Sequence, residues 1–221
     1  MTDVHPDGSP AMDRDLPLRE RKKRRTRRAL ADTALLLFSE NGFEAVTLDE
    51  LVDAVEIAKR TFFRYYSSKE SVAIAAEADL WQATVDRFEG TDLRGLVLDA
   101  LRGALIAAIK GMDEDWDRRF VATRRLIATT PALHKHSMVL SDWAQSRLAA
   151  RLETRFGRDR APALRLLCEI ALGAYWVGAR TWTVRQERGE GPGGSEGREA
   201  LARCVEEAFD LIPSALRLGA E

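Results

Sequence analysis

The sequence has little cysteine, no long apolar run and almost no net charge. Cys168 and Cys204 are the two cysteines in 221 residues, too few for a disulfide-based scaffold. No apolar stretch approaches the roughly 20 residues that a membrane-spanning helix needs. The start of the chain, MTDVHPDGSP, contains acidic residues and no apolar core, unlike a secretory signal. We therefore expect a soluble protein of the reducing cytoplasm.

The low net charge conceals an uneven distribution. The sum is −1, from 34 Lys and Arg against 35 Asp and Glu, and taken alone it argues against nucleic-acid binding. Residues 19–28, RERKKRRTRR, nevertheless hold eight basic residues and one acidic residue. Residues 1–18 contain three prolines and no apolar periodicity, and we expect them to form a disordered tail, in which Met12 is a second candidate start. The acidic residues of this tail are Asp3, Asp7, Asp13 and Asp15.

The composition favours helices along the whole chain. Good helix formers dominate, with 32 Ala, 27 Leu and 28 Arg, and no run of Val, Ile and Thr alternates with the period of a strand. The sequence therefore predicts an all-α protein of about nine helices. The expected helices span residues 21–41, 48–55, 59–66, 67–89, 93–108, 116–128, 131–156, 162–188 and 198–218, with a mobile glycine-rich loop at 189–197.

Two capping boxes delimit a pair of short helices. In Thr47-Leu-Asp-Glu50, the Thr hydroxyl can accept from the N3 amide while the Glu side chain reaches back to the cap amide. A turn at Glu56-Ile57-Ala58 leads to the helix Lys59–Tyr66, and Ser67-Ser-Lys-Glu70 forms the second box. Two short helices joined by a three-residue turn indicate a helix-turn-helix.

Basic and aromatic side chains on the second of these helices suit DNA recognition. Lys59 and Arg60 lie at its N-terminal end, where long cationic donors can reach guanine O6 and N7, and Phe63 can pack on a thymine methyl group. A solvated basic helix is the alternative for each residue taken singly, whereas the whole set favours DNA. The further DNA-contact candidates are Thr47, Thr61, Arg64, Tyr65 and Lys69, with Arg24, Arg25 and Arg28 from the basic block.

The stretch from Ala29 to Ser71 resembles the N-terminal domain of TetR-type transcriptional regulators. The matching features are a first helix that closes on Phe38 and Gly42-Phe43, the Thr47-capped second helix, and the run Thr61–Glu70. The spelling Arg60-Thr-Phe-Phe-Arg-Tyr, with Arg124–Leu133, resembles a subgroup common in GC-rich bacteria.

This resemblance implies an Ω-shaped, all-helical homodimer with a ligand pocket in each C-terminal domain. It divides the chain into a helix-turn-helix domain at 19–66, a connecting helix at 67–89 and an effector-binding and dimerisation domain at 90–221. The implied function is that of a cytoplasmic repressor, which binds a palindromic operator and is released by a small-molecule effector.

The sequence departs from the family pattern at four positions of the helix-turn-helix. Glu56 stands where the turn usually has Gly, and Ala58 where the recognition helix often has a Ser cap; each costs roughly 1 kcal/mol. Phe63 replaces the usual Tyr and Ser67 the usual Pro, so operator preference does not transfer from relatives.

Small and apolar residues near the C-terminus suit a dimer interface between helices. The resemblance assigns dimerisation to the helices at 162–188 and 198–218, where small residues permit close approach. The alternative is that the same residues face the core of one chain. The interface candidates are Ala171, Ala174, Gly178, Trp182, Cys204, Ala208, Leu211 and Ile212.

Candidate pocket residues are mostly aromatic, and a plain core remains their alternative. Arg119, Arg124 and Arg125 either meet an anionic effector or lie on a solvated helix face. The pocket candidates are Trp81, Phe88, Trp116, Phe120, Arg124, Met138, Trp143, Tyr175 and Trp176.

An enzyme is the first competing class. His134 and His136 are two residues apart and point to different sides of a helix, so that pair predicts no metal site. No nucleophile elbow, P-loop or dinucleotide fingerprint occurs, so we expect no enzyme and no cofactor. A second competitor is a TetR-fold DNA-binding protein without an effector, architectural or controlled by a protein partner, and a tightly packed C-terminal domain would favour it.

Overall fold

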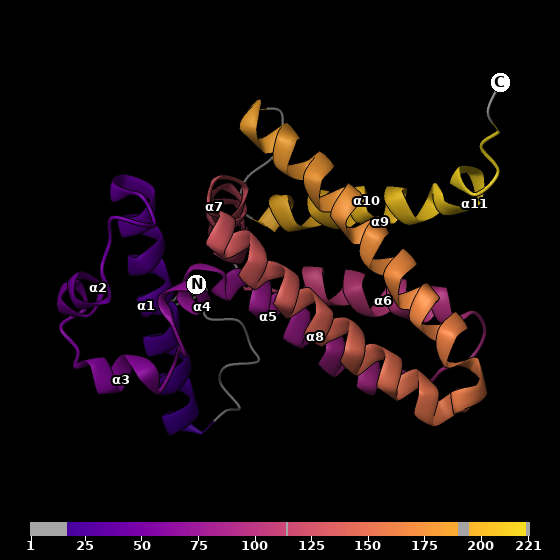
Figure 1. Cartoon of the computed structure of the whole chain (residues 1–221), viewed down its shortest axis with the longest axis horizontal. Helices are drawn as coiled ribbons and strands as arrows, with labels where there is room; N and C mark the ends of the chain where they lie inside the picture. Colours follow the sequence, from indigo (N-terminus) through magenta and orange to yellow (C-terminus); the bar gives the residue numbers. More distant parts are fainter. Residues whose placement is uncertain (1–16, 114, 190–194, 220–221) are drawn as a thin grey trace, which may run out of the picture. The chain divides into compact units, whose positions relative to one another are not determined.

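The computed structural model describes residues 17–113, 115–189 and 195–219, which form helices and connecting turns with no strand in those ranges (Figure 1). The chain divides into two compact units, residues 1–73 and 74–221. The all-α expectation is confirmed. The first unit contains α1 (Leu18–Asn41), α2 (Leu48–Ala54), α3 (Lys59–Phe63) and α4 (Lys69–Ala73). The second contains α5 (Ala75–Glu89), α6 (Val97–Lys110), α7 (Trp116–Thr129), α8 (Pro131–Phe156), the 3-10 helix η2 (Arg158–Arg160), α9 (Ala161–Glu187), α10 (Ser195–Asp210) and α11 (Ile212–Ala215).

The first unit packs its four helices around a small core rich in aromatic residues. Gly42 ends α1 with a φ of +85°, and its N–H donates to the Phe38 carbonyl at 3.0 Å. This reversal brings the Phe38 and Phe43 rings edge to face at 5.0 Å. Side chains from α2 and α3 complete the core, including Leu51 and Phe62, which are both fully buried. Burial of these rings fixes which face of each short helix turns outward.

The predicted capping box at the start of α2 is present. The Glu50 amide donates to Thr47 Oγ at 3.2 Å, and the Thr47 amide donates to Glu50 Oε2 at 2.7 Å. The Thr47 hydroxyl also donates to Glu50 Oε2, at 2.9 Å, and the two bonds from Thr47 to the charged carboxylate lower the pKa of Glu50.

The turn between α2 and α3 has a left-handed residue at the position where the family pattern usually has Gly. Glu56 has a φ of +55°, the one positive φ at a non-glycine position in the described residues. Ala58 caps α3 in an extended conformation and makes no side-chain bond to the helix. Both departures from the family pattern therefore weaken the turn locally.

Reversing both departures is expected to stabilise the first unit. Glu56→Gly relieves roughly 1 kcal/mol of left-handed strain, partly offset by the greater freedom of unfolded glycine. Ala58→Ser adds an N-cap bond worth about 1 kcal/mol, and Ala58 is exposed, which leaves room for the hydroxyl. Urea unfolding of the full chain should show a gain of about 1–2 kcal/mol for the double variant. Glu44→Gly, at an exposed turn position without positive φ, is the matched control and should give no gain.

The expected helix at 67–89 is in fact two helices. Ile74, with φ −104° and ψ +20°, interrupts the helical path and caps α5. The second capping box was also misplaced by one residue. The reciprocal bonds join Ser68 and Ser71, each amide donating to the other residue's hydroxyl at 3.0 and 3.2 Å.

The last expected helix is also divided, and it begins earlier than expected. α10 starts at Ser195, so Ser195–Gly197 are helical and not loop; residues 190–194 of the expected loop, like residues 1–16 of the expected tail, lie outside the described residues. The helix ends at Asp210, because Pro213 has no N–H to donate to the carbonyl four residues back.

α9 crosses α10 at a point where the two backbones nearly touch (Figure 1). A Cβ atom added at Gly178 would lie 2.6 Å from the Cα of Val205 and 2.7 Å from the Cys204 carbonyl oxygen. Gly178 is therefore required by packing within one chain.

Gly178→Ala is expected to destabilise the second unit by about 1–3 kcal/mol, because α9 and α10 must separate to admit the methyl group. Gly103→Ala is the control, since no atom lies within 4 Å of its added Cβ and the exposed helical site should gain about 0.5–1 kcal/mol. Thermal unfolding of both variants checks the pair, and equal shifts would contradict this packing.

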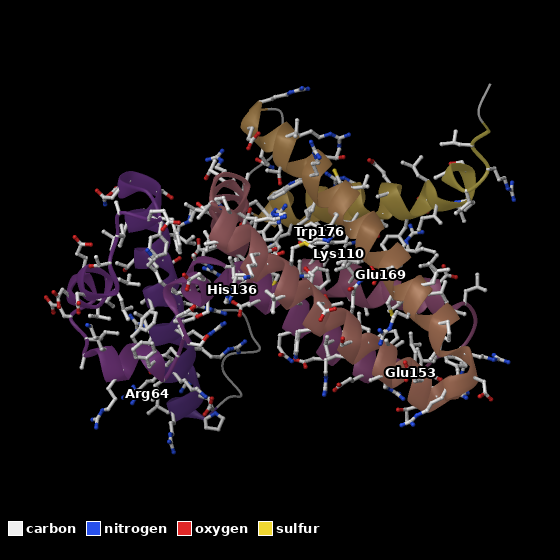
Figure 2. All side chains as sticks on the ribbon, in the orientation of Figure 1. Arg64, Lys110, His136, Glu153, Glu169 and Trp176 are labelled. Atoms are coloured by element: carbon white, nitrogen blue, oxygen red, sulfur yellow. The ribbon has the colours of Figure 1, made fainter. Side chains whose placement is uncertain are left out.

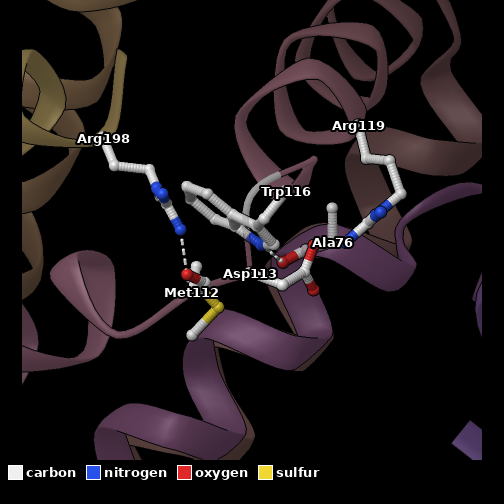
Figure 3. A network of polar contacts seen from close by, with 6 residues as sticks. All are labelled: Ala76, Met112, Asp113, Trp116, Arg119 and Arg198. Atoms are coloured by element: carbon white, nitrogen blue, oxygen red, sulfur yellow. Dashed lines mark hydrogen bonds and ion pairs between the residues drawn. The ribbon is translucent and has the colours of Figure 1, made fainter. Parts of the chain in front are cut away.

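Polar contacts fasten the loop between α6 and α7 to its surroundings (Figure 3). The Trp116 indole N–H donates to the Ala76 carbonyl at 2.8 Å, and Arg119 pairs with Asp113 at 2.6 Å. Arg198 of α10 donates to the Met112 carbonyl. Because Arg119 is buried in this network, it is not a solvated residue.

Candidate nucleic-acid interface

Helix α3 buries one of its two adjacent phenylalanines and exposes the other, and its cationic side chains lie on the exposed side. Phe62 is fully buried, whereas Phe63 is 53% exposed. Lys59, Arg60 and Arg64 share the exposed side, and Thr61 is half-buried. The helix thus places an aromatic ring among three cations on an accessible surface.

Lys59 is held by an acidic residue of the preceding helix. Its Nζ lies 2.6 Å from Asp49 Oδ1, and both side chains are more than half exposed. Exposed ion pairs are worth about 0–1 kcal/mol, so a phosphate or a base edge can take the place of Asp49. Sequence reasoning overlooked Asp49, because two residues ten positions apart on either side of a turn have no spacing that predicts contact.

Arg64 and Tyr65 form a joint group at the end of α3. Arg64 Nη2 donates to the Tyr65 hydroxyl at 3.3 Å, and the guanidinium lies 5.1 Å from the ring centroid. Arg64 lies at the outer edge of the first unit (Figure 2). The pair offers a cation and a hydroxyl side by side.

The basic block of α1 is tied to the residues that follow α3. The Tyr66 hydroxyl donates to the Arg27 carbonyl at 2.9 Å, and the Arg27 guanidinium lies 5.3 Å from the Tyr66 ring centroid. Arg24 and Arg25 are exposed on this helix and Arg28 is half-buried. Tyr66 thus positions the block beside α3, a role that sequence reasoning missed.

Two expected phosphate contacts have partners within the unit. The exposed Thr47 hydroxyl is engaged with Glu50 in the capping box. Lys69 Nζ donates to the Phe43 and Val46 carbonyls at 2.7 and 2.9 Å and lies 4.2 Å from the Phe43 ring centroid. Lys69 therefore fastens the loop before α2.

The nine pocket candidates separate into three groups. Phe88, Trp116 and Phe120 are fully buried packing residues, with Trp116 stacked on Phe120 at 4.5 Å. Met138 and Trp143 lie exposed on α8. The remaining four candidates, Trp81, Arg124, Tyr175 and Trp176, gather around the buried carboxylate of Glu77.

Six of the eight dimer candidates lie inside the second unit. Ala171, Ala174, Gly178, Trp182, Cys204 and Ala208 are buried by the packing of a single chain. Their small side chains permit close helix approach as expected, but the partner helix belongs to the same chain. Leu211 is exposed and Ile212 partly buried, so these two alone of the eight reach the surface.

Both cysteines of the chain are free and buried. Burial raises the pKa of Cys168 to about 11 and also raises the pKa of Cys204, so both free thiols stay protonated at neutral pH. The described His, Cys, Asp and Glu residues form no group of three suited to a metal. None of the described helices combines the length and hydropathy needed to cross a bilayer.

Comparison with known proteins gives two family matches that together cover most of the chain. Residues 30–83 match the model described as "Bacterial regulatory proteins, tetR family", and residues 96–217 match the model described as "MftR C-terminal domain".

Individual relatives are named as regulators. The chain is 31% identical to the HTH-type transcriptional regulator TcmR of Streptomyces glaucescens, over 88% of this chain and 86% of that protein. It is 33% identical to the putative mycofactocin biosynthesis transcriptional regulator MftR of Mycobacterium tuberculosis, over 89% of this chain and 93% of that protein. A TerR/AcrR family transcriptional regulator from Aquifex aeolicus VF5 aligns with a TM-score of 0.49 and 18% identity, over 85% of this chain and 99% of that one.

Proposed function

The chain belongs to the TetR family of bacterial regulatory proteins, and on that basis we propose that it is a cytoplasmic repressor which binds a palindromic operator as a homodimer and is released by a small-molecule effector. As a family member it is a DNA-binding transcriptional regulator and not an enzyme. The observation that carries the proposal is the outward face of α3, with Lys59, Arg60, Phe63 and Arg64 exposed beside the buried Phe62.

Base reading is proposed for the N-terminal end and the exposed ring of α3. Lys59 and Arg60 reach guanine O6 and N7 in the major groove, and Phe63 packs on a thymine methyl group. Lys59 exchanges its exposed Asp49 partner for the base edge. A recognition helix inserted in this way makes these three side chains the source of sequence preference.

Phosphate contacts are proposed for the residues that flank this reading face. They fix the register of α3 and supply affinity that does not depend on sequence. Lys69 is left out, because its ammonium group is occupied by two carbonyls. Thr47 is left out as well, because its hydroxyl donates to the Glu50 carboxylate. The proposed phosphate contacts are Arg24, Arg25, Arg28, Thr61, Arg64 and Tyr65.

The proposed dimer interface is an outer stripe on α9, not the buried residues that the sequence suggested. The outer α9 stripe consists of residues at helical spacing on the side away from the core: Leu166, Ile170, Gly173, Val177, Thr181 and Val184. Leu166 and Val177 are 60% and 55% exposed, although both are large and apolar. A symmetric contact between two copies of this stripe would bury them, and Gly173 would let the helices approach.

Release by an effector is favoured over the effector-free alternative by one part of the second unit. The aromatic group of Trp116, Phe120 and Trp182 is fully buried, contains a single unpartnered polar atom, Trp182 Nε1, among the described residues, and by itself would suit a domain without a ligand. The polar atoms around Glu77 are different, because several of them are buried without a partner among the described residues.

Footprinting on the DNA upstream of the chain's own gene tests the proposal. The expected result is protection of a palindrome whose half-sites lie in successive major grooves, with lower occupancy at higher salt. Protection of a single half-site, or of no defined sequence, would contradict a dimeric operator-binding repressor.

A further inference from the structure

A cluster of polar and aromatic side chains lies among helices α5, α7, α8 and α9. We refer to it as the Glu77 cluster, and its members are Glu77, Trp81, Arg124, Ser137, Tyr175 and Trp176. Each helix contributes at least one member. The cluster therefore joins four elements of the second unit through polar chemistry inside an apolar core.

The carboxylate at its centre is buried and only partly satisfied. Glu77 has no exposed surface; its Oε1 accepts from the Ser137 hydroxyl at 3.0 Å and lies 3.8 Å from Arg124 Nη1. Its Oε2 is buried and has no hydrogen-bond partner among the described residues. Desolvation raises the pKa of this carboxyl, and the Arg124 charge opposes the rise.

Two hydrogen-bond donors beside the carboxylate are also without partners. The Trp81 indole Nε1 and the Tyr175 hydroxyl are both buried and make no hydrogen bond to a described residue. The Trp81 N–H is close enough to Glu77 to lower the pKa of its carboxyl, yet it lies outside hydrogen-bond geometry. An unpaired buried polar atom loses its hydrogen bonds to water without replacement, so three in one place are an unusual concentration of unsatisfied polar atoms.

Aromatic rings surround these atoms, and one side of the cluster reaches solvent. The Trp81 and Tyr175 ring centroids are 4.8 Å apart, and Trp176 lies 5.0 Å from Tyr175. The Arg124 guanidinium lies 4.7 Å from the Trp176 ring centroid. Arg124 and Trp176, the latter labelled in Figure 2, are partly exposed, so this side of the cluster lies nearest to solvent.

The charges of the cluster already balance. Glu77 and Arg124 carry opposite charges, and a further buried charge without a partner would be strongly unfavourable. A neutral ligand avoids this cost. An acceptor on the ligand would serve Trp81 and Tyr175, and an adjacent donor would serve Glu77 Oε2.

We propose that the Glu77 cluster binds a neutral aromatic compound that carries a hydrogen-bond acceptor and a donor on one edge, as an aromatic amide does. This inference rests on the effector part of the proposed function and names the chemical class of that effector. Glu77 lies in the first turn of α5, which follows α4 in the chain after one residue. A ligand bound there acts on the helix that continues directly from the DNA-binding unit.

Three probes with the same ring test the chemical class. They are 2-naphthamide, which is neutral, 2-naphthoate, an anion, and 2-naphthylmethylamine, a cation, each titrated calorimetrically into the full chain without DNA. We expect 2-naphthamide to bind at least about tenfold more tightly than either charged probe, because only the charged probes leave an uncompensated charge.

Three variants assign the contacts. Tyr175→Phe removes only the unpaired hydroxyl; it should weaken 2-naphthamide about tenfold while leaving thermal stability unchanged or higher, a combination that a purely structural role would not produce. Glu77→Gln leaves the Arg124 charge unbalanced and should shift preference to 2-naphthoate. Arg124→Gln leaves the Glu77 charge unbalanced and should shift preference to 2-naphthylmethylamine.

Several results would overturn the inference. The first is no binding of 2-naphthamide, which is expected if ordered water alone forms hydrogen bonds with these atoms. The second is tighter binding of a charged probe than of 2-naphthamide to the unaltered chain. The third is equal affinity of the Tyr175→Phe variant and the unaltered chain for 2-naphthamide. Operator binding is measured separately. If 2-naphthamide binds in a Tyr175-dependent way but the chain protects no operator, the ligand site is supported and the repressor proposal is contradicted. If the chain protects an operator but 2-naphthamide does not bind, the repressor proposal is supported and the ligand site is contradicted.

Discussion

The variant in which Lys59 and Arg60 are both replaced by alanine is expected to lose specific operator binding, with affinity lowered by about a hundredfold or more. Each good bidentate contact to a base is worth about 1–3 kcal/mol, and a dimer repeats the loss in both half-sites. Phe62 remains buried and anchors α3, so the fold should be retained. Fluorescence anisotropy with the footprinted fragment, at one fixed salt concentration, measures the change.

A matched control separates base reading from the loss of positive charge. Arg94 and Lys110 are also cations in exposed ion pairs, with Asp92 and Glu199, and both lie in the second unit. Replacing these two by alanine removes the same charge and should leave operator affinity nearly unchanged. Unaltered binding by the Lys59 and Arg60 double variant would refute the assignment of base reading to α3.

The second large effect is expected from Val177→Asp in the outer α9 stripe. In a symmetric dimer the substitution places two carboxylates at one apolar contact, and burying unpaired charges costs several kcal/mol for each. The variant should therefore elute as a single chain of 24.7 kDa at micromolar concentration. Operator affinity should fall by about a hundredfold, since each half-site then binds without the gain from a linked second site.

Val139→Asp provides the comparison for this experiment. Val139 is exposed to a similar degree, at 63%, but lies on α8. Light scattering after size exclusion should show that this variant stays dimeric and binds the operator normally. A dimer of undiminished stability in Val177→Asp would contradict the stripe, and a monomer in Val139→Asp would move the interface to α8.

Local chemistry in the sequence predicted much of the fold. The Thr47 and Glu50 capping box and the proline at the start of α8 each fixed a helix boundary. For Glu56 the sequence left open a strained or a differently shaped turn, and the structure shows the left-handed conformation, which few residues other than Gly adopt. The capping box at Ser67 was one residue off, since several adjacent serines can form equivalent bonds and only packing selects among them.

The sequence could not show which partner covers each helix face. Gly178 was correctly identified as a point of close helix approach, but helical spacing does not tell whether the other helix belongs to the same chain. Lys69 shows the same limitation, because its carbonyl partners at Phe43 and Val46 are distant in sequence. Glu77 was missed altogether, as a single acidic residue in a helical pattern normally lies on the surface.

The side-chain hydrogen bonds that hold the first unit together also determine when this unit can fold as the chain is synthesised. Tyr66 and Lys69 bind carbonyls that precede them by 39, 26 and 23 residues. α2 and α3, with seven and five residues, are far below the length of about 12–15 at which isolated helices persist. The DNA-binding unit therefore cannot assemble helix by helix as it leaves the ribosome, and it acquires its shape only after Lys69 has emerged.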